Sequence, residues 1–531
     1  MAPTQNWQVR KPGVSSTRGL VAAQNGAAAA VGAGILAAGG SASDAAIAAA
    51  FALSVLEPWN SGLGGIGFMV VHPAGAAGAE VVDFGPVAPQ GLDPAAYPLT
   101  GPQPRTITDR AGTPEMRSEL FTWPQVEGDR NMHGPLSFTI PAAVKGYAAA
   151  HERFGRLPWR DLVAPAAELA RGGLQLDWYA MLRIATAAAD LGRYEESRRI
   201  WLRDGLPPVP PPDETHFMLP LGRLPQTLMR LAEAGPDDFY TGEIAAAIAA
   251  DSRAAGGFLS AADLAGCRAR IGPALEIPYR GTVFQAAPGL TAGPTLARVL
   301  ARLGARRFGA TPDADSFAAL AAALRDAYAD RLANAGDTGL RGETSTTHIT
   351  AIDRDGGIAA LTTTLLSLFG SRTVLPGTGI LINNGVMWFD PQPGRPNSLG
   401  PGKRALTNMC PLVVSRDGRP WFGLGASGGR RILGAVTQMA SFIVDFGMDA
   451  ESAAHHPRID FSGGVHLDID DRLPPAVCER LLAEPDARRV EHVAWPARFA
   501  CPNLVLHGED GRNHGITDVM SPWSATVAEP A

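Results

Sequence analysis

The sequence predicts a layered α+β fold. Helical patterns dominate before about residue 333, strand patterns dominate after it, and helices do not alternate with strands as they do in βαβ proteins. Hydrophobic residues make up 46% of the 531 residues and charged residues only 18%, a composition that can bury a large core and excludes a disordered chain. The 61 glycines and 44 prolines are spread throughout, which indicates many tight turns between short elements.

Charge and cysteine content exclude several classes of partner. The 46 basic and 52 acidic residues give a formal charge of −6, so no basic excess is available to bind a nucleic acid. The 4 cysteines form no CxxC pair and no HExxH or comparable histidine spacing occurs, so we expect no disulfide framework, no metal site and no other cofactor. Residues 1–19 lack the apolar core of a secretory signal, which predicts a cytoplasmic protein.

One uncharged stretch, residues 21–43, has to be compared with a membrane span. It is rich in alanine and glycine rather than in strongly apolar residues, and therefore fits a buried helix better. Its spacing predicts two buried helices at 20–38 and 43–55, with Ser41 or Ser43 as the cap between them. We expect no membrane association.

The remaining elements follow from apolar periodicity and from turn residues. A glycine-rich turn leads into a strand at 68–72, and residues 85–135 indicate a long surface excursion because proline, glycine and polar residues dominate them. Helices are expected within 138–172, 221–255 and 295–332. A polar connector at 334–343 precedes the strand-rich part. There we expect strands at 348–352, 358–365, 379–383, 412–415 and 421–425, followed by a helix at 431–446.

The two strands after the connector predict a hairpin with a defined register. If Arg354, Asp355 and Gly356 form a three-residue loop with Gly356 in the left-handed conformation, Thr346 lies directly opposite Thr364. Facing Cβ atoms in an antiparallel pair are about 4.5–5.5 Å apart, so two hydroxyl groups would meet at the start of the first strand. Spacing alone does not distinguish this pair from an ordinary Thr–Thr contact.

Two glycine motifs resemble known sites. Residues 62–67 match GxGxxG but precede a strand, the reverse of the order in a dinucleotide site, so we expect a tight turn. Residues 425–429 match GxSxG between a strand and a helix, the context of a nucleophile elbow, with Ser427 as nucleophile and Asp445 or Asp449 and a later histidine as partners. The alternative is a glycine-rich turn whose free N–H groups bind an anion without a side-chain nucleophile.

Several segments together resemble the γ-glutamyltransferase family of N-terminal-nucleophile hydrolases. The most specific are Thr346-Thr347-His348, the run 376–384 that ends in Asn-Asn, and Gly428-Gly429. Further matches lie in the helical half, at 36–46, 57–65, 238–242 and 327–331. The resemblance covers most of the chain and implies a four-layer αββα sandwich.

The resemblance also implies a proenzyme that cuts itself between Ser345 and Thr346. Fragments 1–345 and 346–531 would remain one folding unit, as a heterodimer or as a dimer of such heterodimers. After cleavage, Thr346 has a hydroxyl nucleophile and a free α-amine, whose ordinary pKa of about 7.7–8.0 suits a general base.

Three further residues match catalytic positions of the family. Thr364 matches a second threonine that bonds to the nucleophile, and the hairpin register gives a physical reason for this match. Gly428 and Gly429 match a pair whose backbone N–H groups stabilise the oxyanion. Ser427 would then be part of the scaffold.

The segments expected to bind substrate depart from the family pattern. In the family, an arginine that holds the α-carboxylate of glutamate follows an Asp-Phe pair, whereas Gly85 follows the matching pair in this chain. Acidic residues that hold the α-amino group follow Asn-Asn, whereas this chain continues with Gly385 and, three residues later, the apolar Trp388. The family's asparagine two residues after the second threonine is Leu366.

Other polar residues are candidate substrate ligands. Thr407 and Asn408 occupy the positions of paired serines that contact the substrate carboxylate, and both can donate hydrogen bonds. Arg372 and Arg430 lie near the catalytic segments and could hold a carboxylate from another direction. The loss of charged partners would cost a buried zwitterionic glutamate on the order of several kcal/mol, which argues against γ-glutamyl specificity.

The sequence thus predicts a self-cleaving threonine amidohydrolase that makes an acyl ester on Thr346 and passes the acyl group to water. The substrate would be a small amide, such as that of a dicarboxylic acid or an acylated amine, and an oxamate-type amidohydrolase is one candidate. Three alternatives remain: an authentic γ-glutamyltransferase or glutathione hydrolase, a serine hydrolase that uses Ser427, and a binding homologue that no longer processes itself.

Overall fold

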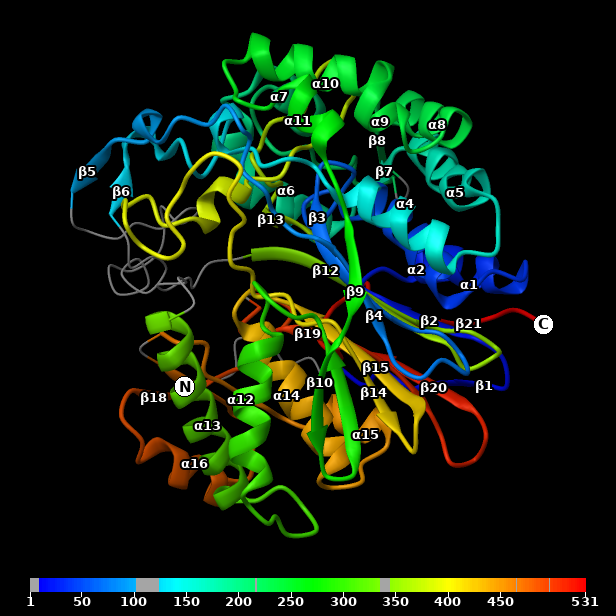
Figure 1. Cartoon of the computed structure of the whole chain (residues 1–531), viewed down its shortest axis with the longest axis vertical. Helices are drawn as coiled ribbons and strands as arrows, with labels where there is room; N and C mark the ends of the chain where they lie inside the picture. The colour runs from blue at the N-terminus through cyan, green and yellow to red at the C-terminus, as the bar shows by residue number, and fades with distance from the viewer. Residues whose placement is uncertain (1–8, 102–123, 215–216, 335–343, 465, 496) are drawn as a thin grey trace.

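Two face-to-face β-sheets form the centre of the protein, and helices cover the outer face of each sheet (Figure 1). The computed structural model describes residues 9–101, 124–214, 217–334, 344–464, 466–495 and 497–531. This arrangement confirms the expected α+β class and the four-layer αββα sandwich. Most of the predicted connector at 334–343 lies outside the described residues.

Both sheets have seven strands, and all neighbouring strands within them are antiparallel. The first sheet has the order β21 (Ala525–Ala528), β2 (Leu20–Ala23), β12 (Thr344–Ile352), β13 (Ile358–Ser367), β3 (Ile66–His72), β4 (Glu80–Phe84) and β9 (Arg270–Pro273). The second has the order β1 (Val14–Ser16), β20 (Asn513–Thr517), β19 (Cys501–His507), β15 (Arg419–Ser427), β14 (Leu412–Arg416), β11 (Thr282–Ala286) and β10 (Leu275–Tyr279).

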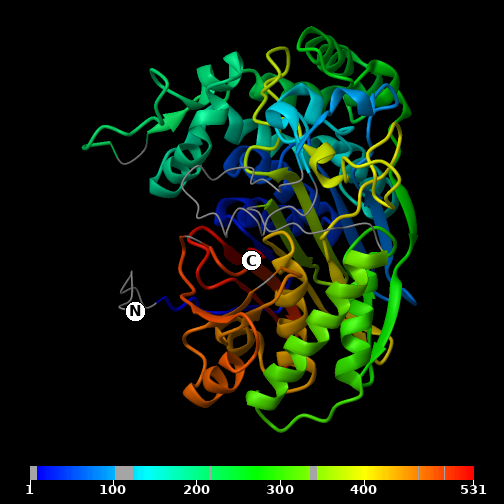
Figure 2. The ribbon, with the colours of Figure 1, turned by 90° about the vertical axis from the view of Figure 1, so that its left-hand side faces the viewer.

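Each sheet packs against its own set of helices, and Figure 2 shows the two helical layers from the side. The first sheet is covered by α1 (Gly26–Ala37), α2 (Ala42–Leu56), α4 (Ala143–Phe154) and α5 (Trp159–Gly172). This layer continues with α6 (Trp178–Leu191), α7 (Glu195–Trp201), α8 (Leu224–Ala234), α9 (Asp238–Thr241), α10 (Glu243–Ala254) and α11 (Ala261–Gly266). The second sheet is covered by α12 (Gly293–Gly304), α13 (Ala314–Asn334), α14 (Arg431–Val444), α15 (Ala450–His455) and α16 (Pro475–Leu482).

The alanine-rich pair α1 and α2 is buried, as the sequence predicts. Ser41 caps α2 in a capping box with Asp44. The first helix, however, does not begin at residue 20, because Leu20–Ala23 pair with β12 and β21 as strand β2. A short uncharged apolar run fits a buried strand as well as a buried helix, and only the neighbouring strands decide between them.

Three further expectations were wrong in part. Residues 379–383 form no strand: Gly379 has a φ of 73°, and Ile382 makes only an isolated bridge to Gly64. The described parts of 85–135 are not simply a surface excursion, because Ala88, Leu92, Tyr97 and Val126 are buried in the core. Strands are also more frequent before residue 333 than expected, because seven of the fourteen described strands in the two sheets precede residue 344.

Within the described ranges, no helix has both the length and the apolar character needed to cross a membrane. In the same residues, no three His, Cys, Asp or Glu side chains are grouped in the way that metal ligands are.

Candidate functional site

A pair of threonines lies at one end of the β12–β13 hairpin. Gly356 has a φ of 90° in the loop, and the register places Thr346 opposite Thr364, as predicted. Thr346 Oγ1 donates a hydrogen bond to Thr364 Oγ1 over 3.3 Å, and Thr346 is only 4% exposed. The two hydroxyl groups therefore meet at the start of the first strand of the hairpin.

A β-bulge in β13 faces the peptide bond before Thr346. Ser345 pairs with Leu366 while Thr346 pairs with Thr364, so Leu365 is the extra residue. The bulge gives Leu366 a φ of 85°, which leucine rarely adopts, and the Leu366 N–H donates to Thr364 Oγ1 over 2.7 Å. Bulges beside active sites re-aim side chains, and this one fixes the Thr364 hydroxyl.

Strand β15 packs against β12 across the interface between the two sheets. A Cβ atom added at Gly425 would lie 2.2 Å from the His348 ring, and one at Gly423 would lie 2.7 Å from the Thr350 side chain. A step of two residues toward the C-terminus of β15, from Gly423 to Gly425, therefore corresponds to a step of two residues toward the N-terminus of β12, from Thr350 to His348. Continued by two residues on each strand, this alignment relates Ser427, the last residue of β15, to Thr346, so we expect the turn after β15 near Thr346.

The turn after β15 presents free backbone donors. Gly428 and Gly429 have φ values of 130° and 63°, and α14 begins two residues after Gly429. Neither N–H group donates a hydrogen bond to another residue in the described part of the chain. A Cβ atom at Gly428 would lie 2.9 Å from Ala500 Cα, so the backbones approach too closely for a side chain. Such a turn can stabilise an oxyanion.

The alternative serine site is not assembled. Ser427 Oγ accepts a hydrogen bond from Gln24 Nε2, and none of the described histidines bonds to it. Asp445 lies at the far end of α14, where it accepts from the Tyr279 hydroxyl over 2.9 Å. Asp449 caps α15. The geometry therefore favours the glycine-turn interpretation of this motif.

Thr407 and Asn408 form a buried segment beside the turn between β11 and α12. Thr407 Oγ1 donates its hydrogen bond to the Leu290 carbonyl over 3.0 Å, so this hydroxyl proton is not available to a ligand. Asn408 Oδ1 accepts from Arg331 Nη2 over 3.2 Å, whereas Asn408 Nδ2 is buried and has no partner among the described residues. Of the two side chains, Asn408 is the one that can donate to a ligand.

The Asn-Asn pair is bonded to the scaffold. The Asn384 N–H donates to the Leu365 carbonyl at the bulge, and Asn384 Oδ1 accepts from the Ser367 N–H. Asn383 Oδ1 accepts from Thr139 Oγ1 over 2.6 Å and from the Gly385 N–H over 2.9 Å. A Cβ atom at Gly385 would lie 2.2 Å from Thr139 Oγ1, so this backbone leaves no room for an acidic side chain at that position. Trp388 is 3% exposed, and its Nε1 has no partner in the described chain.

The two candidate arginines are both enclosed. Arg372 Nη1 donates to the Gly370 carbonyl over 2.7 Å and to Ser367 Oγ over 2.5 Å, and burial lowers the pKa of its guanidinium. Arg430 is 3% exposed and donates to the Ser462 carbonyl over 3.0 Å. Arg372 therefore supports the segment after the bulge and does not face an open site.

Sequence reasoning missed three side chains that support these segments. Arg331 binds the 407–408 segment, and Gln24 binds Ser427. Arg404 forms an ion pair with Asp83, and its Nη2 lies 3.2 Å from the position of a Cβ atom on Gly85. Arg331 lies in the segment 327–331 that resembles the family, and this resemblance could have indicated its importance. The sequence near Gln24 and Arg404 contains no comparable motif.

Two buried titratable groups lie close to these elements. His348 is fully enclosed, and burial lowers its pKa to about 3, so the neutral ring bridges Thr362 Oγ1 and Thr350 Oγ1 at 2.8 and 2.9 Å. Burial raises the pKa of the Glu57 carboxyl to about 7, although a hydrogen bond from Asn60 opposes this shift. His348 is a structural group, and Glu57 changes charge near neutral pH.

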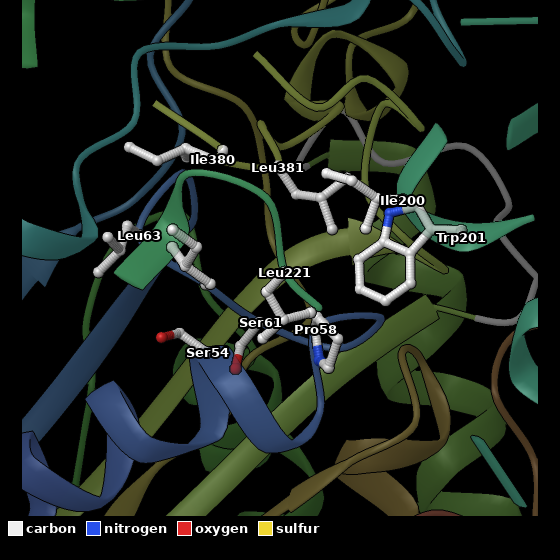
Figure 3. Close-up of a pocket in the computed structure, with 12 residues that line it drawn as sticks. Ser54, Pro58, Ser61, Leu63, Ile200, Trp201, Leu221, Ile380 and Leu381 are labelled. Atoms are coloured by element: carbon white, nitrogen blue, oxygen red, sulfur yellow. The ribbon is translucent and has the colours of Figure 1, made fainter. Parts of the chain in front are cut away.

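A separate pocket of about 370 Å³, part of which is open solvent, lies beside the end of α2 (Figure 3). Ile200, Trp201, Leu221, Ile380 and Leu381 form its apolar wall, and Ser54 and Ser61 lie at its α2 side. The lining includes neither Thr346 nor a titratable side chain, so we assign no chemistry to it.

Comparisons with known proteins match almost the whole chain. The sequence profile of a family described as Gamma-glutamyltranspeptidase matches residues 28–342 and 339–493. The Acylase ACY 1 proenzyme of Pseudomonas sp. (strain SE83) is 31% identical over 94% of this chain and 92% of its own length. The Glutathione hydrolase proenzyme of Escherichia coli (strain K12) is 27% identical over 96% of this chain and 91% of its own length.

The fold also matches a solved structure. The crystal structure of a cephalosporin acylase from Bacillus halodurans superposes with a TM-score of 0.83, covering 100% of this chain and 99% of the other. The two sequences are 22% identical, so this likeness bears on the fold alone.

Proposed function

Because the chain belongs to the gamma-glutamyltranspeptidase family, we propose that it is a self-processing threonine amidohydrolase that cuts itself between Ser345 and Thr346. The observation that supports this most directly is the hydrogen-bonded pair Thr346–Thr364, on a hairpin that packs against β15, because the turn after β15 has two N–H groups without a partner in the described residues. A nucleophile, its hydroxyl partner and an oxyanion site are the parts that acyl transfer requires.

Maturation follows from the same groups. The Thr346 hydroxyl attacks the Ser345 carbonyl carbon, the C–N bond breaks, and the peptide becomes an ester with the α-amine released. Water then cleaves the ester and leaves a carboxylate on Ser345 and a free hydroxyl on Thr346. The bulge opposite this bond interrupts the regular ladder at the position where the carbonyl must become tetrahedral.

Turnover repeats this chemistry on a bound amide. The α-amine of Thr346 takes the hydroxyl proton, the oxygen attacks the amide carbonyl, and the negative oxygen is stabilised by the N–H groups of Gly428 and Gly429. The protonated amine passes its proton to the leaving nitrogen, and an acyl ester remains on Thr346. Water, deprotonated by the same amine, hydrolyses the ester.

The two fragments interleave, which supports a heterodimer that stays assembled after cleavage. Strands β1, β2, β3, β4, β9, β10 and β11 come from 1–345 and share both sheets with strands from 346–531. Separation would break strand pairing inside both sheets, so we propose that 1–345 and 346–531 act as one unit.

The substrate we propose is a small amide that is not specifically a γ-glutamyl compound. Gly385 has no room for an acidic partner of an ammonium group, and Gly85 has no side chain to bind a carboxylate. Asn408 Nδ2 is a buried donor without a partner in the described residues, and Trp388 is the apolar residue that stands where the family has an acidic one. An amide of a dicarboxylic acid fits these features, and an oxamate-type amide is one example.

Denaturing mass spectrometry of the purified protein tests the proposal. We expect two chains, the second beginning at Thr346, and a single uncut chain without amidase activity for Thr346→Ala. Ser427→Ala is the matched control and should still be cut. An uncut wild-type chain that is fully active would refute the assigned nucleophile, and rapid turnover of γ-glutamyl-p-nitroanilide relative to other anilides would favour an authentic γ-glutamyltransferase.

A further inference from the structure

The turn between β20 and β21 gathers oxygen atoms around a single cation. The Nζ group of Lys11 donates to three backbone carbonyls, those of Asp518, Ser521 and Ser524, at 2.8–2.9 Å. Two hydroxyl oxygens complete the set, Ser524 Oγ at 2.6 Å and Thr517 Oγ1 at 3.3 Å. These five oxygens are called the 517–524 cage below.

The cage holds more oxygens than an ammonium group can bond. A lysine ammonium has three N–H donors, so at most three of the five oxygens can receive a hydrogen bond of their own. The oxygens therefore surround the positive charge in the way that ligands surround a bound ion. This arrangement is typical of a cation site rather than of a set of separate hydrogen bonds.

The distances and the ligand types indicate which ion the cage suits. Ca²⁺ takes oxygen ligands at about 2.3–2.6 Å and Mg²⁺ at about 2.0–2.1 Å, and both ions favour carboxylates. The cage oxygens lie 2.6–3.3 Å from Nζ and belong to carbonyl and hydroxyl groups. Backbone carbonyls replace the hydration shell of K⁺ in potassium channels. The cage therefore suits K⁺ or NH₄⁺ rather than a divalent ion.

The turn keeps its shape through bonds of its own. The Asp518 N–H donates to the Pro502 carbonyl over 2.8 Å. Ser524 Oγ donates to the carbonyls of Asp518 and Ser521 at 3.2 and 3.3 Å, so the lone pairs of this hydroxyl remain available to a cation. None of these bonds involves Lys11, and we expect the cage to persist without it.

Electrostatics also favour a cation at this position. Burial lowers the pKa of the Lys11 ammonium, and the nearby Asp518 carboxylate opposes this shift because it favours the charged form. Asp518 is 1% exposed, and its Oδ2 accepts from Arg458 Nη2 over 2.8 Å. Burial alone would raise the pKa of the Asp518 carboxyl, but His492 and Arg458 hold it below its ordinary value. A negative charge therefore lies beside the cage at neutral pH.

We propose that the 517–524 cage is a binding site for a monovalent cation of the size of K⁺ or NH₄⁺, and that the chain fills this site with its own Lys11 ammonium. The ammonium thereby ties residues 9–13 to the turn between β20 and β21. Free K⁺ or NH₄⁺ enters the cage once the Lys11 side chain is removed. The cage lies outside the candidate functional site, so its occupancy can be measured without reference to amidase activity.

Thermal melting of Lys11→Ala tests for the site. Ionic strength is kept constant with tetramethylammonium chloride, whose cation is too large for the cage. When about 100 mM of this salt is replaced by KCl or NH₄Cl, we expect the Tm of Lys11→Ala to rise by about 3 °C or more, because a ligand that binds only the folded state stabilises it. The wild type should not respond, because Lys11 already fills its cage. No rise, or an equal rise in the wild type, would overturn the site, and an equal effect of NaCl would overturn the proposed ion size.

Two further variants locate the effect. Arg10→Ala removes the neighbouring exposed cation and is the matched control, so its Tm should not depend on K⁺. The addition of Ser524→Ala to Lys11→Ala removes one cage oxygen, and half of the rise in Tm should then require at least about threefold more KCl. An unchanged K⁺ response in the double variant would show that the ion binds elsewhere.

Crystals give a direct readout of the ion. Crystals of Lys11→Ala grown in rubidium chloride should show an anomalous peak where Nζ lies in the wild type, and a peak elsewhere or none would refute the site. If Lys11→Ala folds only in KCl, its unfolding on dialysis into tetramethylammonium chloride, but not into ammonium chloride, would support the site. A variant that folds in neither salt would count against it, because a filled cage should restore the fold.

Discussion

Thr364 Oγ1 accepts a hydrogen bond from Thr346 Oγ1 over 3.3 Å and lies directly opposite it in the β12–β13 register. The Leu366 N–H also donates to Thr364 Oγ1, over 2.7 Å, so the acceptor is fixed by the backbone of the bulge. Thr364→Val keeps the shape of the side chain but removes the oxygen. We expect turnover to fall roughly 10- to 100-fold, because the proposed nucleophile, Thr346, loses the hydrogen bond that orients it.

Thr364→Ser is the matched control for this prediction, since it retains the oxygen. It should keep most of the activity in a steady-state assay, whereas Thr364→Val should not, and both should melt within a few degrees of the wild type. Full activity of Thr364→Val would show that the hydroxyl pair is only a cross-strand contact.

Gly385 should not tolerate a side chain. A Cβ atom there would lie 2.2 Å from Thr139 Oγ1, and Thr139 is held by Asn383. We expect Gly385→Ala to destabilise the protein by about 1–3 kcal/mol through overpacking, measured as a lower thermal midpoint and a lower yield of processed protein. Gly172→Ala, at a site with open space, is the control and should change little. A normal midpoint for Gly385→Ala would contradict the close contact.

The sequence predicts the hairpin well because its signals are local. The Asp355-Gly356 loop and the strand periodicity fix the register, so the opposition of Thr346 and Thr364 needs no information from distant residues. The bulge at Leu365 cannot be predicted in this way, because the Leu365 N–H donates to the carbonyl of Asn60, which is distant in the sequence.

The features that the sequence analysis did not predict depend on partners that are distant in the sequence. Leu20–Ala23 became a strand because β12 and β21 flank it, and no property of the four residues alone requires this. Arg331 acquires its role through contacts with residues 76 and 77 positions away. A side chain that binds a remote carbonyl leaves no periodic signal, so its function becomes visible only in the fold.

Lys11 should contribute strongly to stability through the C-terminal part of the chain. Its Nζ donates to the carbonyl oxygens of Asp518, Ser521 and Ser524 at 2.8–2.9 Å. We expect Lys11→Ala to lower the free energy of unfolding by about 2–4 kcal/mol, because buried carbonyls lose a charged donor. This can be measured by denaturant titration of the processed protein.

Arg10→Ala provides the comparison, because Arg10 is the neighbouring cation but is exposed. Its side chain is 83% exposed and pairs with Glu451 at the surface, so its loss should change stability by less than about 1 kcal/mol. Equal changes in the free energy of unfolding for the two substitutions would show that the Lys11 contacts do not stabilise the C-terminal segment.

Glu57 should make stability fall as the pH rises toward neutrality. Burial raises the pKa of its carboxyl from 4.5 to about 7 in the fold, against a hydrogen bond from Asn60 and the charge of Arg183. Below about pH 4.5 the group is protonated in both the folded and the unfolded states, and its full contribution is present. Between about pH 4.5 and 7 the unfolded state loses its proton first, so stability is lost progressively, by an amount on the order of 3 kcal/mol.

Glu57→Gln removes this titration and isolates its effect. The variant should be more stable than the wild type at pH 8, and the difference between their thermal midpoints should shrink as the pH is lowered to 5. Glu57 and Asn60 are joined by a 2.7 Å hydrogen bond, and Asn60 O accepts from the Leu365 N–H at the bulge. Glu57 is therefore linked through Asn60 to the β12–β13 hairpin. A difference between the thermal midpoints of the two proteins that stays constant from pH 5 to 8 would disprove the predicted titration.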